Sequence, residues 1–175
     1  MTEKELKMAM PGITVKNLKK YLPVLNSVLS DYGINTPIRL AHFLAQIGHE
    51  TLSFYYYREI GSGIAYECRK DLGNTQKGDG VKFKGRGAIQ ITGRSNYLEV
   101  SKFLFGDDRL LNNPELLELP EFGIKAACWF WTKHNLNKYA DEDNIIKITK
   151  KINGGINGLK DRKERLLLAK KAFNI

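Results

Sequence analysis

Apolar residues recur every three or four positions in the first third of the chain, which is the spacing of one helix face. Within Val15–Leu29 they occupy positions 18, 22, 25, 28 and 29, and within Ile38–Glu50 positions 40, 41, 44 and 47. Between these segments, Tyr32–Asn35 contains a glycine suited to a left-handed helix stop, and Thr36-Pro37 provides an N-cap and a first-turn proline. The pattern predicts two helices separated by a turn.

Glycine changes the pattern in the middle of the chain. Eight glycines fall between residues 60 and 93, which favours a turn-rich region with short strands at Val81–Lys84 and Ala88–Thr92. No repeat or linker divides the sequence, so we expect one catalytic domain over residues 1–175, mainly α-helical with a small β element. Helical spacing returns in four later segments, at Ser95–Phe105, Pro120–Lys133, Asp143–Lys151 and Asp161–Phe173.

The charge balance is strongly basic. The sequence has 28 lysines and arginines against 19 acidic residues, a net charge of +9, with 42% hydrophobic residues. Such a charge favours anionic partners without choosing among nucleic acid, membrane surface and cell-wall polymer. No stretch reaches the roughly 18 apolar residues of a membrane span, and the N-terminus lacks a secretory signal. We expect a protein made in a cytoplasm and not inserted stably in a membrane.

Cysteine and histidine are too few for a disulfide framework or a zinc site. Cys68 and Cys128 allow at most one disulfide, and Cys128 lies in an apolar run where a buried, reduced thiol is favoured. The histidines lack zinc-ligand spacing, since they stand at positions 42, 49 and 134. The sequence therefore predicts no metal centre.

Two glutamates stand on either side of an aromatic run. Glu50 ends the second apolar stripe, and Glu59 follows nine positions later, after Phe54–Tyr57. On one continuous helix they would lie on nearly opposite faces, so they can share a substrate only if the helix ends near Glu50 and the chain turns. A protonated carboxyl beside apolar surface and a second carboxylate that activates water are the pair used in glycoside hydrolysis. Taken alone, two such glutamates are more often ordinary surface residues.

The segment Lys82–Tyr97 has the residues of a ligand-binding strand. Glycines on both sides of Arg86 let the backbone approach a ligand, and Gln90 and Thr92 would share one face of a strand. Asn96 opens the next helix, where its amide could bind sugar hydroxyl or acetamido groups.

Two other interpretations of this segment compete. A phosphate-binding loop lacks both the Walker spacing and the dinucleotide fingerprint. A nucleic-acid patch is the second, with four basic side chains and two aromatic rings for base stacking: Lys82, Lys84, Arg86, Arg94, Phe83 and Tyr97.

A third candidate segment is Lys151–Gly158. It also fits a plain helix end and turn before a last amphipathic helix.

Together and in this order, these segments resemble the family 19 glycoside hydrolases, in the chitinase-like branch that phages use as endolysins. The resemblance runs from about Tyr32 to Phe173. It rests on RLAHFLAQIGHE at 39–50, RKDLGN at 69–74, DG at 79–80, GRGAIQITGRSNY at 85–97 and INGG at 152–155.

The resemblance implies a mainly α-helical, lysozyme-like fold with two lobes, a small β element lining the cleft, and an inverting mechanism without metal or cofactor. Glu50 would be the general acid and Glu59 the general base, about 6.5–9.5 Å apart. Thr92 would help to hold the attacking water. Arg162 and Arg165 compete for the family's late arginine. The resemblance assigns substrate binding to His49, Gln90, Asn96, Tyr97, Asn153 and Arg165.

Two β-1,4-linked polymers remain open as substrate, chitin and the glycan strand of peptidoglycan. The charge of +9 favours peptidoglycan, because bacterial envelopes are anionic and chitin is nearly neutral. We expect a monomeric endolysin for host cell lysis that reaches the wall through a holin-type lesion. Basic residues near the C-terminus either assist its attachment to the envelope or form an ordinary solvated helix face: Lys160, Arg162, Lys163, Arg165, Lys170 and Lys171. The alternatives are a chitinase acting on chitin oligomers and a non-catalytic glycan- or nucleic-acid-binding protein.

Overall fold

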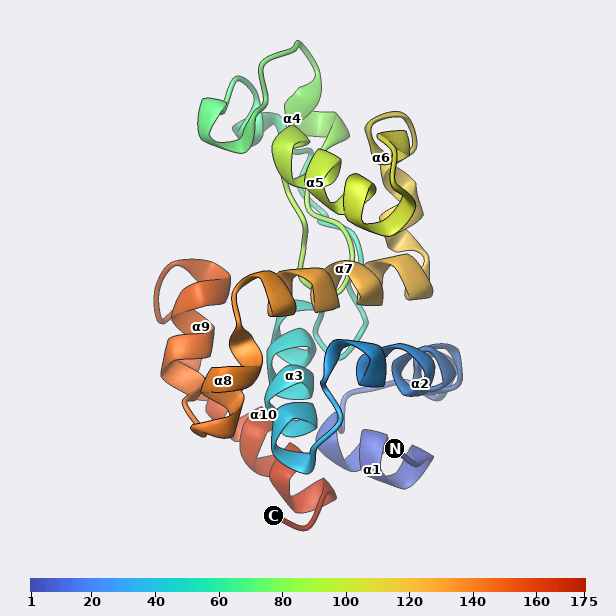
Figure 1. Cartoon of the computed structure of the whole chain (residues 1–175), viewed down its shortest axis with the longest axis vertical. Coiled ribbons are helices and arrows are strands. Elements are labelled where there is room, and N and C mark those ends of the chain that lie inside the picture. The colour runs from blue at the N-terminus through green and yellow to red at the C-terminus, as the bar shows by residue number, and fades with distance from the viewer. The chain divides into compact units, whose positions relative to one another are not determined.

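The computed structural model describes all 175 residues and is built almost entirely of helices (Figure 1). The mainly α-helical fold class predicted from the sequence is confirmed. The chain divides into two compact units, one formed by Met1–Tyr55 with Phe130–Ile175 and the other by Tyr56–Trp129. None of the helices combines the length and apolar character that a membrane crossing requires.

The first unit is organised around α3 (Pro37–Glu50) and α10 (Leu159–Ala172), which pack against each other. Residues 41–48 of α3 are all buried, so this helix forms the centre of the unit. Helix α7 (Pro120–Lys133) belongs to the second unit up to Trp129 and to the first unit from Phe130. The other helices of the first unit are α1 (Glu3–Ala9), α2 (Val15–Val28), α8 (Leu136–Asp141) and α9 (Ile145–Asn153), with a 3-10 turn at Leu29–Tyr32.

Helix α3 begins and ends as its sequence dictates. The Arg39 amide donates to the Thr36 hydroxyl at 3.4 Å, and Pro37 occupies the first turn. After Glu50 the chain turns sharply, because three successive residues, Leu52–Phe54, have left-handed φ angles of 48°, 57° and 66°. Such angles are costly for residues with side chains, at roughly 1 kcal/mol or more each. The predicted helix end and turn at Glu50 are confirmed.

The turn is held by contacts of its last residue. The Phe54 ring stacks on Tyr21 at a centroid distance of 4.1 Å, and the Phe54 amide donates to the Thr51 hydroxyl at 2.8 Å. The Phe54 carbonyl accepts from the Asn17 side chain at 2.9 Å. These contacts offset the backbone strain and fix the chain directly after Glu50.

The second unit contains short helices and turns. Its helices are α4 (Asp79–Lys82), α5 (Arg94–Phe105), α6 (Arg109–Asn112) and the start of α7, with 3-10 turns at Ile64–Tyr66, Lys70–Leu72 and Pro114–Glu118. Cys128 is buried in α7, and burial raises the pKa of its thiol. Cys68 is exposed, and both cysteines are free.

The two predicted strands are wrong. Val81 and Lys82 belong to α4, and the segment 88–92 contains only an isolated bridge between Arg86 and Ile91. The physical reason is a tight turn, since Gly87 and Gln90 both have positive φ, at 80° and 54°. The Arg86 and Ile91 backbones therefore exchange hydrogen bonds across the turn, and the segment has no strand alternation.

Candidate active site

Glu50, in the first unit, is held by one buried arginine. Arg162 of α10 donates from Nη2 to Glu50 Oε1 at 2.5 Å and from Nη1 to Gln46 Oε1 at 2.5 Å. Arg162 is 2% exposed and Gln46 is fully buried, whereas the Glu50 side chain is 19% exposed. Gln46 and Glu50 are one helical turn apart, so a planar guanidinium can bridge them. The arrangement fixes one carboxylate oxygen of Glu50 and leaves Oε2 without a partner.

A second polar chain runs beside this pair. His49 Nδ1 lies 2.7 Å from Asp161 Oδ2, and Arg165 donates to the same oxygen at 2.6 Å and to the Ser53 hydroxyl at 3.0 Å. Burial alone would raise the pKa of Asp161, but the hydrogen bonds from Arg165 and His49 outweigh it and lower that pKa. Asp161 is therefore ionised and orients the His49 ring.

The turn between α9 and α10 contacts both His49 and Arg162. Gly158 has φ +69°, and a Cβ atom there would lie 2.2 Å from His49 Cε1, so the backbone presses directly on the imidazole. Within the turn, Asn153 Nδ2 donates to the Asn157 carbonyl at 2.9 Å, and Asn153 Oδ1 accepts from the Gly155 backbone amide at 2.8 Å. The Asn157 carbonyl also accepts from Arg162 Nε at 3.3 Å. Asn153 therefore braces the turn that contacts Arg162.

Glu59, in the second unit, is held at both carboxylate oxygens. The Tyr66 hydroxyl donates to Oε1 at 3.1 Å, and the Gly85 amide donates to Oε2 at 3.0 Å. Burial and the neighbouring Glu59 carboxylate raise the pKa of Tyr66, so the phenol keeps its proton and remains a donor. The Glu59 amide also donates to the Gly85 carbonyl at 2.9 Å, which ties the two segments together.

The peptide group that binds Glu59 is itself fixed from behind. The Lys84 carbonyl, which belongs to the same peptide as the Gly85 amide, accepts from the Tyr97 hydroxyl at 2.7 Å. Arg86 Nη1 contacts the Tyr97 hydroxyl at 2.9 Å, and Arg86 Nε donates to Glu118 at 2.9 Å. Hydrogen bonding at a carbonyl polarises the peptide and strengthens its N–H as a donor. Tyr97 and Arg86 thus position Glu59 indirectly.

Gln90 lies on the same small surface as Glu59. A Cβ atom on Gly85 would lie 2.7 Å from Gln90 Oε1 and 3.3 Å from Glu59 Oε2, so only glycine leaves both side chains in place. The Thr92 hydroxyl donates to the Gln90 carbonyl at 2.9 Å, and the Asn96 amide donates to the Thr92 carbonyl at 2.8 Å. The structure brings these residues together, and Asn96 Oδ1 has no partner in the chain.

Tyr97 does not fit the substrate-binding role expected from the sequence. Its side chain is 0% exposed, and its hydroxyl is engaged with Lys84 and Arg86, so it has no surface for a sugar. The alternative nucleic-acid patch is also not formed. Phe83 is fully buried, Arg86 is paired with Glu118, and Arg94 donates to Asp79 at 2.6 and 2.9 Å.

The sequence interpretation missed several residues of this site. Gln46 carries a detectable signal, because it precedes Glu50 by four positions on a helix. Asp161 likewise precedes Arg165 by four. Tyr66 carried no signal, since it lies in a 3-10 turn of only three residues. No group of three or more His, Cys, Asp or Glu side chains is arranged to hold a metal ion.

Residues 35–152 match the glycoside hydrolase 19 family model, described as chitinase class I. This segment exceeds half of the 175 residues. It contains every site residue expected from the sequence except Asn153 and Arg165.

Individual proteins with related names are also similar to this chain in sequence. The chain is 28% identical to the glycosyl hydrolase family 19 domain-containing protein of Haemophilus influenzae over 176 residues, covering 83% of this chain and 85% of that protein. It is 36% identical to the endochitinase At2g43620 of Arabidopsis thaliana over 124 residues, or 66% of this chain. The match takes in only 39% of the plant protein, so the chain spans about two fifths of that relative.

Solved structures share the fold. Chitinase C from Streptomyces griseus HUT6037 superposes with a TM-score of 0.78 at 23% identity, over 99% of this chain and 76% of that one. A family GH19, class IV chitinase from Zea mays superposes with a TM-score of 0.70 at 21% identity, over 96% of this chain and 85% of that one. At these identities the likeness concerns the fold.

Proposed function

Because the chain belongs to glycoside hydrolase family 19, and is therefore an enzyme that hydrolyses glycans, we propose that it cleaves the β-1,4 bonds of bacterial peptidoglycan. The proposed reaction inverts the anomeric centre. Glu50 gives its proton to the glycosidic oxygen as the bond to the anomeric carbon breaks. Water attacks that carbon from the opposite face, Glu59 takes the proton of this water, and Thr92 helps to orient it. The expected carboxyl separation stays a prediction.

The observation that carries this proposal is the way each glutamate is held. Arg162 fixes one oxygen of Glu50, and this guanidinium stabilises the carboxylate that remains once the proton has been given away. Tyr66 and the Gly85 amide each donate to one oxygen of Glu59, so both donors fix the position of this carboxyl group.

The proposed sugar contacts come from side chains that keep free polar atoms. Gln90 and Asn96 are both half-buried, Gln90 lies near Glu59 at Gly85, and the open Asn96 Oδ1 suits a sugar hydroxyl or acetamido N–H. His49 is oriented by Asp161 and packs against Gly158, so a contact between its ring and sugar stays a prediction. Asn153 and Arg165 act as braces, since their polar groups bind within the first unit.

Charge supports peptidoglycan over chitin. The chain carries a net charge of +9, which attracts it to an anionic bacterial envelope and gives no advantage on nearly neutral chitin. We accordingly propose a monomeric endolysin, made in the cytoplasm of an infected bacterium, that acts on the wall during host lysis. Chitin oligomers are the second candidate substrate, because relatives named endochitinases match the chain.

A lysis assay with three variants tests this proposal. Wild-type protein should clear a suspension of outer-membrane-permeabilised bacteria. Glu50→Gln and Glu59→Gln should each lower the rate about 100-fold or more, since each removes one proton transfer. Glu115→Gln is the matched control, because Glu115 is exposed and forms no ion pair, and it should clear cells at the wild-type rate.

Mass spectrometry of the fragments identifies the bond. Reducing N-acetylmuramic acid ends indicate a muramidase, and reducing N-acetylglucosamine ends a glucosaminidase. Release of sugar from chitin oligomers but not from purified walls would replace the first candidate with the second. Equal activity of all three variants would refute two-carboxylate catalysis.

A further inference from the structure

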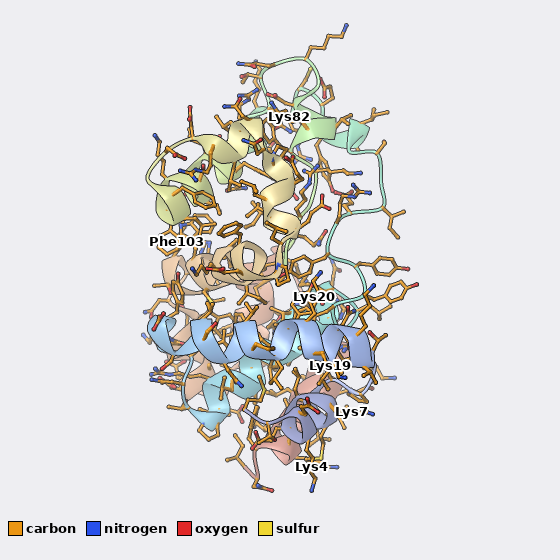
Figure 2. All side chains as sticks on the ribbon, turned by 90° about the vertical axis from the view of Figure 1, so that its right-hand side faces the viewer. Lys4, Lys7, Lys19, Lys20, Lys82 and Phe103 are labelled. Atoms are coloured by element: carbon orange, nitrogen blue, oxygen red, sulfur yellow. The ribbon has the colours of Figure 1, made fainter.

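Helices α1 and α2 and the loop between them enclose a lysine-rimmed hollow of about 350 Å³. Lys4 and Lys7 project from α1, and Lys19 and Lys20 from α2, on the face turned to the viewer in Figure 2. The hollow lies entirely in the first unit and outside the segment that matches the family model. It is lined by Glu3, Lys4, Lys7, Ile13, Val15, Leu18 and Lys19.

The lysines around the hollow are not neutralised by the protein. The first 20 residues contain five lysines, all exposed, and two glutamates, an excess of three positive charges. None of these lysines forms an ion pair, Glu5 is occupied by the Thr2 amide at 2.6 Å, and Glu3 is the one carboxylate beside the three lysines that line the hollow. Gathered like charges repel one another, and a bound anion would remove that repulsion.

The floor of the hollow is apolar. Ile13 and Leu18 are buried beneath it, and Val15 at its edge is 64% exposed. Recognition of bases uses stacking or planar hydrogen-bonding groups, but Tyr21, the aromatic residue of α2, is buried and every basic residue here is a lysine. An apolar floor below an ammonium rim instead matches a ligand that is both anionic and lipidic.

We propose that this hollow docks the protein on a membrane surface by binding an anionic phospholipid. The phosphate oxygens lie among the ammonium groups of Lys4, Lys7 and Lys19. The glycerol and the first acyl carbons rest on Ile13, Val15 and Leu18. The protein stays at the interface, and the proposed site is separate from Glu50 and Glu59, so glycan hydrolysis does not depend on it.

Co-sedimentation with vesicles tests the proposal. The full chain should bind vesicles of phosphatidylglycerol and phosphatidylcholine, and not vesicles of phosphatidylcholine alone, with affinity that falls steeply as salt rises. The variant K4Q/K7Q/K19Q should bind at least tenfold more weakly, since each lysine near an anionic surface contributes roughly fivefold. Val15→Asp should also weaken binding, because it places a carboxylate on the apolar edge.

The control is K77Q/K102Q/K138Q, which removes the same charge from exposed lysines without ion pairs elsewhere. It should lose less than threefold in vesicle binding. Hydrolysis of a soluble glycan by K4Q/K7Q/K19Q should equal that of wild type, which shows that the variant is folded.

Three results would overturn the site. The first is an equal loss in the control variant, which would assign binding to net charge. The second is displacement from vesicles by millimolar inorganic phosphate, which would reveal a simple anion site. The third is binding of single-stranded oligonucleotide, weakened by K4Q/K7Q/K19Q, with no binding to either vesicle.

Discussion

At the scale of single residues, one guanidinium serves two side chains of α3. Arg162 reaches Gln46 and Glu50 at the same time because they stand one helical turn apart. Two arginines, Arg162 and Arg165, lie three positions apart on α10, so the sequence could not decide which of them meets Glu50. Packing of α10 against α3 decides it, and packing is a property of the folded chain.

Arg162→Lys should lower kcat at least tenfold with a smaller change in KM. A lysine ammonium cannot bridge two oxygens as a planar fork does, so Glu50 loses its fixed orientation. Stability should fall by about 2–3 kcal/mol, because buried Gln46 loses its partner. Steady-state kinetics and urea unfolding measure the two effects. Arg109→Lys, at an exposed ion pair with Asp107, should leave both quantities unchanged.

Tyr97→Phe should lower kcat severalfold and leave KM nearly unchanged. The variant removes the hydroxyl that fixes the Lys84–Gly85 peptide, so Glu59 is held less firmly, and the lost buried hydrogen bonds cost about 1–2 kcal/mol of stability. Tyr139→Phe, which removes a hydroxyl from the other unit, is the control in the same assays. A loss of stability with unchanged kcat would show that Tyr97 has no effect on the reaction.

At the scale of elements, periodicity predicted the long helices and failed for the short ones. The segments that became α2, α3, α5, α7, α9 and α10 extend over nine or more residues, which is enough to display a helical period. Helices α4 and α6 have only four residues each and cannot show one. Helix α1 was missed although Thr2 and Glu5 form a capping box, a signal that depends on two residues and not on a period.

The predicted strands are wrong because the alternation of polar and apolar residues was assumed to reflect an extended backbone. Gln90 and Thr92 are two apart, but the positive φ of Gln90 breaks the extended backbone that the argument needs. The two residues still lie together, since Thr92 donates to the Gln90 carbonyl. The roles expected of Gln90 and Thr92 came from the family resemblance. Their relative positions could be known only from the folded structure.

The turn between α9 and α10 offers a matched pair of glycine variants. Gly154→Ala and Gly158→Ala both place a side chain on a left-handed residue, which costs about 1 kcal/mol. Only Gly158→Ala also drives a Cβ into the His49 ring, so it should lose at least 1 kcal/mol more and reduce activity. Thermal unfolding and hydrolysis assays compare them. Equal losses would show that the His49 contact contributes nothing.

At the scale of the whole molecule, acid sensitivity should follow buried ion pairs. Asp79 is 1% exposed and paired with Arg94, whose hydrogen bonds lower the pKa of Asp79 below the unfolded value of 3.8. The folded protein therefore binds fewer protons, so this stabilisation is present above about pH 4 and is lost as pH falls through the lowered pKa.

Asp79→Asn should flatten this acid dependence. The variant should be less stable than wild type at pH 6, and the difference should shrink between pH 4 and pH 2, because the wild type loses the ion pair there. Melting temperatures across pH 2–7 provide the measurement. Asp71→Asn, at an exposed pair with Arg69, should follow the wild-type curve. Parallel curves for wild type and Asp79→Asn would contradict this assignment.

The first unit is assembled from the two ends of the chain, and this has a consequence for biosynthesis. Arg162 is made 112 residues after Glu50, on α10. While the chain is being synthesised, Glu50 is therefore present before the guanidinium that orients it. A polypeptide that stops short of Arg162 should leave Glu50 unoriented and should be inert.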